Sequence, residues 1–177
     1  VISSQPPNTE GQAFLAARGV CCLPQTTEPF GDPLLVVLSP AVPYDLPLLT
    51  AARARGVPVI GEVELAACFL KGRTIGITGA NGKTTTTALT GHLLQECGIS
   101  NQVGGNIGTA VTSLVATSSE DQWNVLELSS FQLETIYRFH AQISACLNVT
   151  PEHLDRHHTF AAYAAAKARL FDTQLTG

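Results

Sequence analysis

The chain has 177 residues, of which 45% are hydrophobic and 14% charged, and its formal net charge is −4 at pH 7. This composition excludes a disordered chain, and the length indicates one domain or two incomplete ones. The acidic balance gives no electrostatic basis for binding nucleic acid, and the apolar runs are too short to span a membrane, so we expect neither partner.

The two ends and the cysteines support three further expectations. The first residue is Val1 and the chain contains no Met, so we expect a truncated or incompletely recorded sequence. No charged and apolar leader opens the chain. The five Cys are scattered and form no C-x-x-C pair, which is typical of reduced thiols. We therefore expect a cytoplasmic protein.

Regular structure is predicted mainly after residue 33. Before it, a helix is predicted over 11–18, which Gly19 would end. Strands are then predicted as apolar runs over 34–38, 57–60, 74–77, 102–103, 123–128 and 142–149. Helices are predicted between Asp45, a good N-cap, and Gly56, and over 62–69, 83–97, 109–116, 131–137 and 160–171. The alternation predicts an α/β fold, with a parallel sheet buried between helical layers.

The segment Thr78–Thr84 (TGANGKT) follows a predicted strand and opens a predicted helix. Its glycines let backbone N–H groups turn toward phosphate oxygens, and the helix N-terminus adds a favourable dipole. Lys83 would reach the β- and γ-phosphates, and the Thr84 hydroxyl would bind Mg²⁺. The general phosphate-loop pattern has a glycine where Ile77 stands, so a glycine-rich turn without a ligand is the alternative.

Polar residues follow other predicted strands. Glu127 lies at the carboxyl end of a buried strand, where ligand sites occur in open α/β sheets, and could hold Mg²⁺ or cap the next helix. Gly104–Asn106 taken alone is a turn that allows close backbone approach. Ser129 and Ser130 taken alone are ordinary N-caps.

Two further candidates lie near the end of the chain. His153 is placed in a loop after a strand, where it would be solvated or a ligand, and His157 and His158 are interpreted as surface residues. Lys167 falls in the apolar stripe of the last predicted helix. The other members of that stripe are Phe160, Tyr163, Leu170 and Phe171. Its ammonium would either reach water past the stripe or have a lowered pKa in a functional site.

The loop T-G-x-N-G-K-[ST] resembles that of the Mur ligase family, which also lacks the first glycine. Segments 104–108, 127–134 and 148–156 are similar to one branch, the ligases that add D-glutamate to UDP-N-acetylmuramoyl-L-alanine. The block over 127–134 is the most specific of the three. The resemblance covers roughly residues 34–171.

The resemblance implies ATP, two Mg²⁺ ions and a set of site residues. The implied catalytic residues are Lys83, His153 and Lys167, and the implied ATP-binding residues are Gly79, Asn81, Gly82, Lys83, Thr84 and Thr85. The implied magnesium ligands are Thr84, Glu127, His153 and Lys167, the lysine being carbamylated within Tyr163–Lys167 (YAAAK). Substrate contacts are implied for Ser39, Asn106 and Ser129. Ala41 stands where the family has glycine and would be strained if the position needs a positive φ.

The implied reaction belongs to peptidoglycan biosynthesis. The carboxylate of UDP-N-acetylmuramoyl-L-alanine attacks ATP to give an acyl phosphate, which the amine of D-glutamate then attacks. We expect part of a Rossmann-like, UDP-binding N-terminal domain over 1–71 and an incomplete P-loop parallel-sheet ATPase domain over 72–177. We expect a monomer, and no turnover by this chain alone. A ligase of the folylpolyglutamate synthetase type and a nucleotide-binding scaffold without catalysis remain as alternatives.

Overall fold

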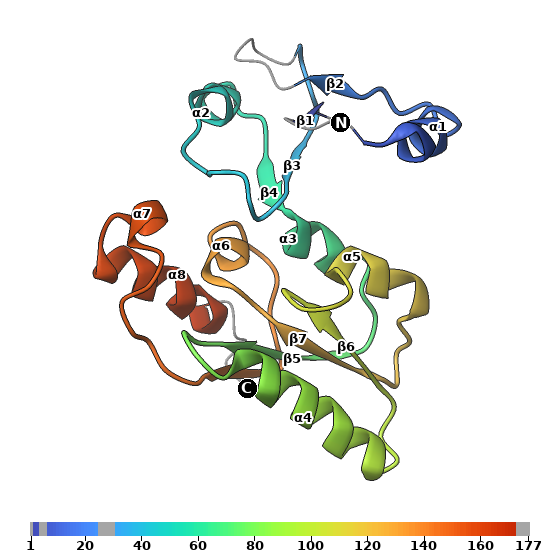
Figure 1. Cartoon of the computed structure of the whole chain (residues 1–177), viewed down its shortest axis with the longest axis vertical. Coiled ribbons are helices and arrows are strands. Elements are labelled where there is room, and N and C mark those ends of the chain that lie inside the picture. The colour runs from blue at the N-terminus through green and yellow to red at the C-terminus, as the bar shows by residue number, and fades with distance from the viewer. Residues whose placement is uncertain (1, 4–6, 25–30, 173–177) are drawn as a thin grey trace.

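The computed structural model describes residues 2–3, 7–24 and 31–172 (Figure 1). Its first part holds helix α1 (Thr9–Ala16) and two short parallel strands, β1 (Ile2–Ser3) and β2 (Leu23–Pro24). The predicted helix over 11–18 is confirmed but begins earlier, because the Asn8 side chain accepts a hydrogen bond from the Gly11 N–H at 2.8 Å. The strands were missed because two residues carry no periodicity.

A second small parallel sheet pairs β3 (Val36–Leu38) with β4 (Val59–Gly61), and α2 (Pro47–Ala54) connects them. The predicted strand over 34–38 begins too early, since Leu34 is 94% exposed. The prediction of Asp45 as N-cap is also wrong: Leu46 precedes the helix without a side-chain bond, and Pro47 supplies the favourable first position. The buried core of this part comprises Leu38, Leu49, Ala52 and Val59.

The main sheet has four parallel strands in the order β6-β7-β5-β8. Their bounds are β5 (Arg73–Thr78), β6 (Asn101–Gly105), β7 (Trp123–Glu127) and β8 (Ile143–Cys146). The strand predicted over 142–149 ends at Cys146. The next N–H, of Leu147, still donates to the Thr78 carbonyl of β5 at 3.0 Å, and the residues after it belong to no strand.

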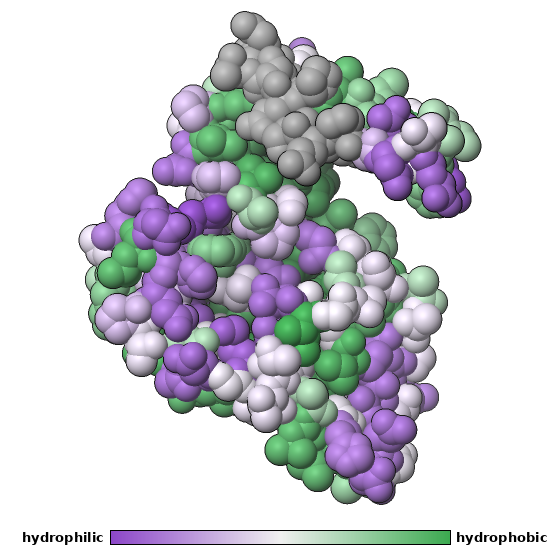
Figure 2. Space-filling view, in the orientation of Figure 1, coloured by the Kyte–Doolittle hydropathy of each residue, from purple (hydrophilic) through white to green (hydrophobic). Residues whose placement is uncertain are grey.

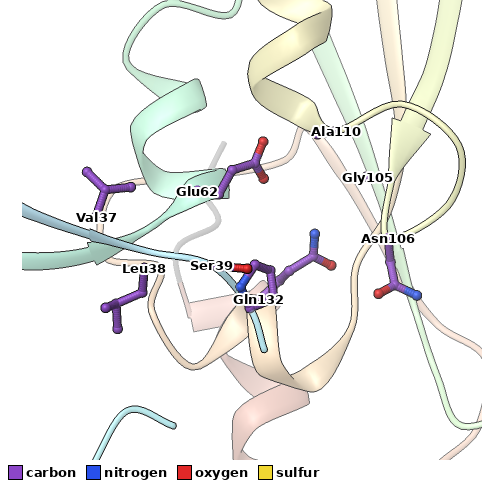
Figure 3. A pocket seen from close by; sticks show the side chains of 9 residues that line it. Val37, Leu38, Ser39, Glu62, Gly105, Asn106, Ala110 and Gln132 are labelled. Atoms are coloured by element: carbon purple, nitrogen blue, oxygen red, sulfur yellow. The ribbon is translucent and has the colours of Figure 1, made fainter. Parts of the chain in front are cut away.

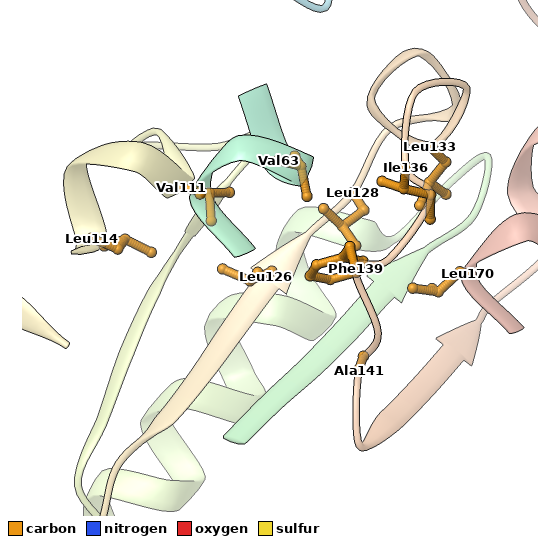
Figure 4. Close-up of a cluster of buried hydrophobic side chains, with 11 residues drawn as sticks. Val63, Val111, Leu114, Leu126, Leu128, Leu133, Ile136, Phe139, Ala141 and Leu170 are labelled. Carbon is orange, nitrogen blue, oxygen red and sulfur yellow. The ribbon is translucent and has the colours of Figure 1, made fainter. Parts of the chain in front are cut away.

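Helices cover both faces of this sheet, as predicted for an α/β fold (Figure 1). α4 (Lys83–Glu96) packs on one face, where Ile75, Ile77 and Val125 form the core. On the other face lie α3 (Glu62–Ala67), α5 (Val111–Leu114), α6 (Ser130–Leu133) and α8 (Phe160–Asp172), around a second core that includes Leu126 and Leu170 (Figure 4). Val125 and Leu126 alternate between the faces, as neighbours in a strand must.

Two predicted helices are shorter than expected. The segment 109–116 divides into α5 and the single 3₁₀ turn η1 (Val115–Thr117). The segment 131–137 becomes the short α6, because the buried Glu64 carboxylate captures the next backbone donors. The N–H groups of Tyr137, Arg138 and Phe139 donate to it at 2.8, 2.8 and 3.0 Å. The one-turn helix α7 (Leu154–His157) was not predicted.

The surface of α8 differs from the predicted pattern. In α8, Tyr163, Lys167 and Leu170 are buried, but Phe160 and Phe171 are 44% and 40% exposed. Apolar side chains also lie on the surface over α4 (Figure 2), where Leu89 and Leu93 are about half exposed. Among the described residues, no helix is long and apolar enough to cross a membrane. Four of the cysteines, Cys22, Cys68, Cys97 and Cys146, are free thiols.

Candidate functional site

The predicted phosphate loop connects β5 to α4 at the carboxyl edge of the main sheet. Gly82 directly precedes the helix with φ of +83°, a left-handed conformation that glycine adopts without strain. Lys83 begins the helix and folds back, so that its Nζ donates to the Ala80 carbonyl at 2.7 Å. Asn81 and Thr85 are exposed on the loop and on the first turn of the helix. The loop therefore has the shape and charge of an anion-binding turn.

Asn148, just beyond the neighbouring strand β8, holds this loop, a role that sequence reasoning missed. Its Oδ1 accepts hydrogen bonds from the N–H groups of Ala80 and Asn81 at 3.1 and 2.9 Å. Its Nδ2 donates to the Asn81 carbonyl at 3.0 Å. The available signal was its place just beyond β8, which adjoins β5 in the sheet.

Glu127 ends β7 at the same edge and is 1% exposed. The Thr84 hydroxyl donates to one carboxylate oxygen at 2.8 Å, and the Asn106 amide donates to the other at 2.7 Å. Residues predicted from three separate segments therefore meet at one carboxylate. Thr84 and Asn106 are themselves exposed, so the group opens toward solvent on their side.

Lys167 reaches the loop from α8 and is 3% exposed. Its Nζ donates to the Gly79 carbonyl at 2.7 Å and lies 4.7 Å from the centre of the Tyr163 ring. The alternative in which its ammonium reaches water is thus wrong. Burial, and then the charge of Lys83, lower the pKa of Lys167 from 10.5 to about 8. Two lysines therefore converge on one loop, which concentrates positive charge in an acidic chain.

His153 lies near Tyr163 and directly precedes α7. Its backbone is left-handed, with φ of +53°. Its ring is 4.9 Å from the Phe131 ring and 6.4 Å from the Tyr163 ring, measured between centroids. The side chain is exposed, so it is available to a ligand, although no ion pair fixes it among the described residues.

The interpretation of His157 as a surface residue is wrong, whereas His158 is exposed as predicted. His157 is 6% exposed, and its Nε2 lies 3.0 Å from the Ser130 hydroxyl. Its Nδ1 lies 3.2 Å from a Glu134 carboxylate oxygen. Burial lowers the pKa of His157, and the nearby Glu134 opposes that shift. Spacing alone could not reveal this burial, because it depends on how α7 packs against α6.

A cavity of about 470 Å³ separates the two larger sheets (Figure 3). Ser39 lines it beyond β3, and Asn106 lines it beyond β6. Gln132 also lines the cavity. Ser129, the N-cap of α6, forms a capping box with Gln132. The N-cap interpretation of Ser129 is therefore confirmed. Ala41 has no positive φ, so the strain considered for that position is absent.

The donor set limits how a metal could bind. Among the described residues, no three His, Cys, Asp or Glu side chains are grouped to hold a metal ion. Glu127 and the Thr84 hydroxyl provide two neighbouring oxygen ligands of the kind that Mg²⁺ prefers. Such a site needs further oxygens from a bound phosphate or from water. An anionic phosphate ligand is also what the two lysines would attract.

Sequence comparison with curated proteins gives close relatives. The chain is 67% identical over 153 residues to the UDP-N-acetylmuramoylalanine–D-glutamate ligase of Solibacter usitatus, covering 86% of this chain and 35% of that protein. It is 59% identical over 145 residues to the ligase of the same name from Koribacter versatilis, covering 82% and 32%. The chain thus spans about a third of the length of the curated relatives it matches.

Structural comparison gives the same group of folds. The UDP-N-acetylmuramate–alanine ligase MurC from Thermotoga maritima matches with a TM-score of 0.51 at 25% identity, covering 98% of this chain and 41% of that one. A second match shows the fold alone: the UDP-N-acetylmuramate:L-alanyl-γ-D-glutamyl-meso-diaminopimelate ligase from Neisseria meningitides. Its TM-score is 0.58 at 15% identity, covering 99% and 60%. The sequence profile of the Mur ligase middle domain matches residues 77–177, more than half of the chain, and the chain therefore belongs to the Mur ligase family.

Proposed function

We propose that this chain is part of an ATP-dependent ligase that joins D-glutamate to UDP-N-acetylmuramoyl-L-alanine in peptidoglycan synthesis. The observation that carries the proposal is the 67% identity over 153 residues to a ligase of that name. The grouping of Lys83, Thr84, Asn106, Glu127 and Lys167 at one sheet edge supports it, because phosphoryl transfer needs clustered positive charge and oxygen ligands.

ATP is proposed to bind at the loop between β5 and α4, with Gly79, Asn81, Gly82 and Thr85 around its phosphates. The Lys83 ammonium would leave the Ala80 carbonyl and pair with phosphate oxygens, a stronger partner for a cation. The N-terminus of α4 would add its dipole. Asn148 supports this assignment indirectly, since it braces the loop in one shape before the nucleotide arrives.

Thr84 and Glu127 are proposed to hold one Mg²⁺, and His153 and a carbamylated Lys167 a second. The oxygen donors at Glu127 fit such an ion, and the lowered pKa of Lys167 leaves a fraction of neutral amine that can take up carbon dioxide. Carbamylation would replace a buried cation by an anionic oxygen ligand. When bound, the ions would neutralise charge on the transferred phosphoryl group.

The cavity between β3 and β6 is the proposed site for the sugar nucleotide. Ser39 and Asn106 line it, and Ser129, which caps α6 beside the lining residue Gln132, is proposed to face the substrate as well. The substrate carboxylate would attack the γ-phosphorus of ATP and displace ADP, and the acyl phosphate would then react with the D-glutamate amine to form the amide and release phosphate. Lys83, Lys167 and His153, the proposed catalytic residues, would position the reacting groups and stabilise their negative charge.

Phosphate release tests this proposal directly. The protein that carries this sequence, at its full natural length, is given ATP, Mg²⁺ and UDP-N-acetylmuramoyl-L-alanine with a panel of amino acids. We expect release that requires D-glutamate and is lost in Lys83→Ala. Release with a different amino acid would keep the protein in the family but move it to another branch. ATP binding without release for any acceptor would indicate a non-catalytic scaffold.

The remaining parts of the proposal concern organisation. We propose a division near residue 71, between a UDP-binding part and the ATP-binding part, which corresponds to the step from the β3-β4 sheet to the main sheet. We also propose a cytoplasmic, monomeric enzyme. Size-exclusion chromatography with light scattering would test the monomer.

A further inference from the structure

Glu134, the residue that follows α6, bonds two residues of α7 at once. One carboxylate oxygen accepts a hydrogen bond from Arg156 Nη2 at 2.8 Å, and the other lies 3.2 Å from His157 Nδ1. The side chains of Glu134 and Arg156 are only 17% and 15% exposed. We call these three residues the α7 anchor. A shielded, two-point contact of this kind fixes geometry better than a surface ion pair does.

The anchor determines where His153 lies. α7 is a single turn, in which the Arg156 and His157 N–H groups both donate to the His153 carbonyl, at 3.1 and 2.9 Å. Fixing the side chains of Arg156 and His157 therefore also fixes the backbone of His153, which directly precedes the helix. The Phe131 ring packs against both imidazoles, with centroid separations of 4.9 Å to His153 and 5.6 Å to His157.

Arg156 also contacts the loop that follows β3. The same Nη2 donates to the Val42 carbonyl at 3.1 Å. Val42 belongs to the loop after β3, three residues beyond Ser39, which lines the cavity. One guanidinium thus joins the loop at the cavity to the carboxylate that holds α7. A shift of either partner changes the geometry available to the other.

We propose that Glu134 and Arg156 are positioning residues that hold His153 ready to bind metal and couple it to ligand binding in the cavity. This inference rests on the proposed function, which places a metal ion at His153 and a sugar nucleotide at Ser39. A sugar nucleotide that orders the Ser39–Val42 loop stabilises the Arg156 contact, and through Glu134 it stabilises α7. Because coupling is reciprocal, metal at His153 must strengthen sugar-nucleotide binding by the same factor.

Metal binding is the first test, measured by electron paramagnetic resonance with Mn²⁺ and a non-hydrolysable ATP analogue. The protein is used at its full natural length, with and without UDP-N-acetylmuramoyl-L-alanine. We expect Glu134→Gln and Arg156→Met to weaken Mn²⁺ binding about tenfold, as loss of a residue behind a metal ligand does. We expect the sugar nucleotide to tighten Mn²⁺ binding in the wild type and to do so at most twofold in Arg156→Met.

Matched controls come from exposed ion pairs elsewhere. Glu120→Gln removes a carboxylate 3.8 Å from Lys71, and Arg55→Met removes a guanidinium 3.4 Å from Asp32. Neither should change Mn²⁺ binding or its dependence on the sugar nucleotide. Arg156→Lys keeps the positive charge, but its side chain is one atom shorter and does not bring its nitrogen to the place where Nη2 meets both Glu134 and Val42. It should therefore restore Mn²⁺ affinity more than the coupling.

Hydrogen exchange gives a readout that needs no ligand. The Arg156 and His157 amides should exchange about tenfold faster in Glu134→Gln, while those of β5 and β7 stay protected. A double variant, Glu134→Gln with Arg156→Met, should weaken Mn²⁺ binding less than the product of the single effects, because both act through one contact.

Defined results would overturn the proposal. It fails if the anchor variants bind Mn²⁺ as the wild type does, or if His153→Ala leaves Mn²⁺ binding unchanged. It also fails if β5 and β7 lose protection together with α7, since the anchor would then only support folding. A protein that uses an amino acid other than D-glutamate contradicts the proposed function alone, and the Mn²⁺ coupling still decides the positioning role.

Discussion

Lys167 is a buried amine whose short hydrogen bond goes to a backbone carbonyl, that of Gly79 at 2.7 Å. Burial and Lys83 lower its pKa to about 8. In buffer free of metal and bicarbonate, we expect its carbon resonances, observed by NMR in protein with labelled lysine, to titrate near pH 8. Lys167→Met identifies the signal by removing it. A midpoint near the ordinary value of 10.5 would contradict the burial of the charged group.

The same shift has a sign for stability. Since the folded pKa of Lys167 lies below the unfolded value, the unfolded chain binds more protons between pH 8 and 10.5. The free energy of unfolding therefore rises with pH through this window, and the destabilisation is complete below pH 8. Lys167→Met should gain most over the wild type at pH 7 in urea unfolding, with the difference narrowing toward pH 10.5.

Asn148 should influence nucleotide binding without touching the nucleotide's phosphates. Asn148→Ala leaves the Ala80 and Asn81 N–H groups without their side-chain acceptor. We expect a loss of about 2 kcal/mol in unfolding free energy and about tenfold weaker ATP binding by calorimetry. Asn101→Ala is the control, because that side chain makes an exposed bond to the Ile99 carbonyl. Equal ATP affinity in the two variants would exclude the bracing role.

Some residue roles could be predicted from the sequence and others could not. Glu127 was predictable, since a carboxylate after a buried strand falls at the sheet edge where ligands bind. The role of Asn148 depends on β8 lying beside β5, which chain order does not specify. The burial of His157 depends on Glu134 and Ser130, which approach it only through tertiary packing.

At the scale of elements, the end of β6 fits tightly against β7. Gly105 has φ of +105°, and a Cβ there would lie 2.2 Å from the Glu127 carbonyl oxygen. Gly105→Ala should cost about 3 kcal/mol in unfolding free energy, from strain and the displaced backbone. Gly108→Ala, at φ of +60° with nothing within 4 Å, should cost only about 1 kcal/mol. Similar losses, measured by chemical denaturation, would contradict the fit.

Element lengths were the least predictable part of the fold. Residues 131–137 have the pattern of a longer helix, but Glu64 lies far away in sequence and takes the N–H groups that would have continued it. A long-range contact also explains the additional turn α7, whose residues have no helical periodicity. Glu134 holds Arg156 in this turn, and Ser130 holds His157. Long-range carboxylates thus override local preference at both places.

At the scale of the whole molecule, polar contacts connect the β3-β4 part to the main sheet. The Tyr44 and Tyr137 hydroxyls lie 2.8 Å apart, and the Gly61 N–H donates to the Thr135 carbonyl at 3.3 Å. Because the two-stranded β3-β4 sheet has a small core of its own, it should unfold locally before the four-stranded main sheet does. We expect amides of β3 and β4 to exchange before those of β5 and β7 in hydrogen-exchange mass spectrometry. A single rate for both sheets would indicate one cooperative unit instead.

The overall architecture followed from the sequence more securely than any boundary did. Largely apolar runs such as 123–128 predicted strands buried on both faces, and Val125 and Leu126 indeed face opposite cores. The pattern did not show that β8 would be half open. Its residues Ile143 and Cys146 are exposed, because in the described part of the chain β5 is its only partner strand.

The left-handed backbone of His153 sets thermal stability against the metal binding that we propose for this residue. A φ of +53° is uncommon for residues with a Cβ atom, and glycine and asparagine adopt it most readily. Laboratory evolution that selects for heat resistance alone should therefore favour asparagine or glycine at position 153. Such variants would gain thermal stability but lose the imidazole. The residue at position 153 should therefore be determined in each heat-resistant variant before its activity is compared with that of the wild type.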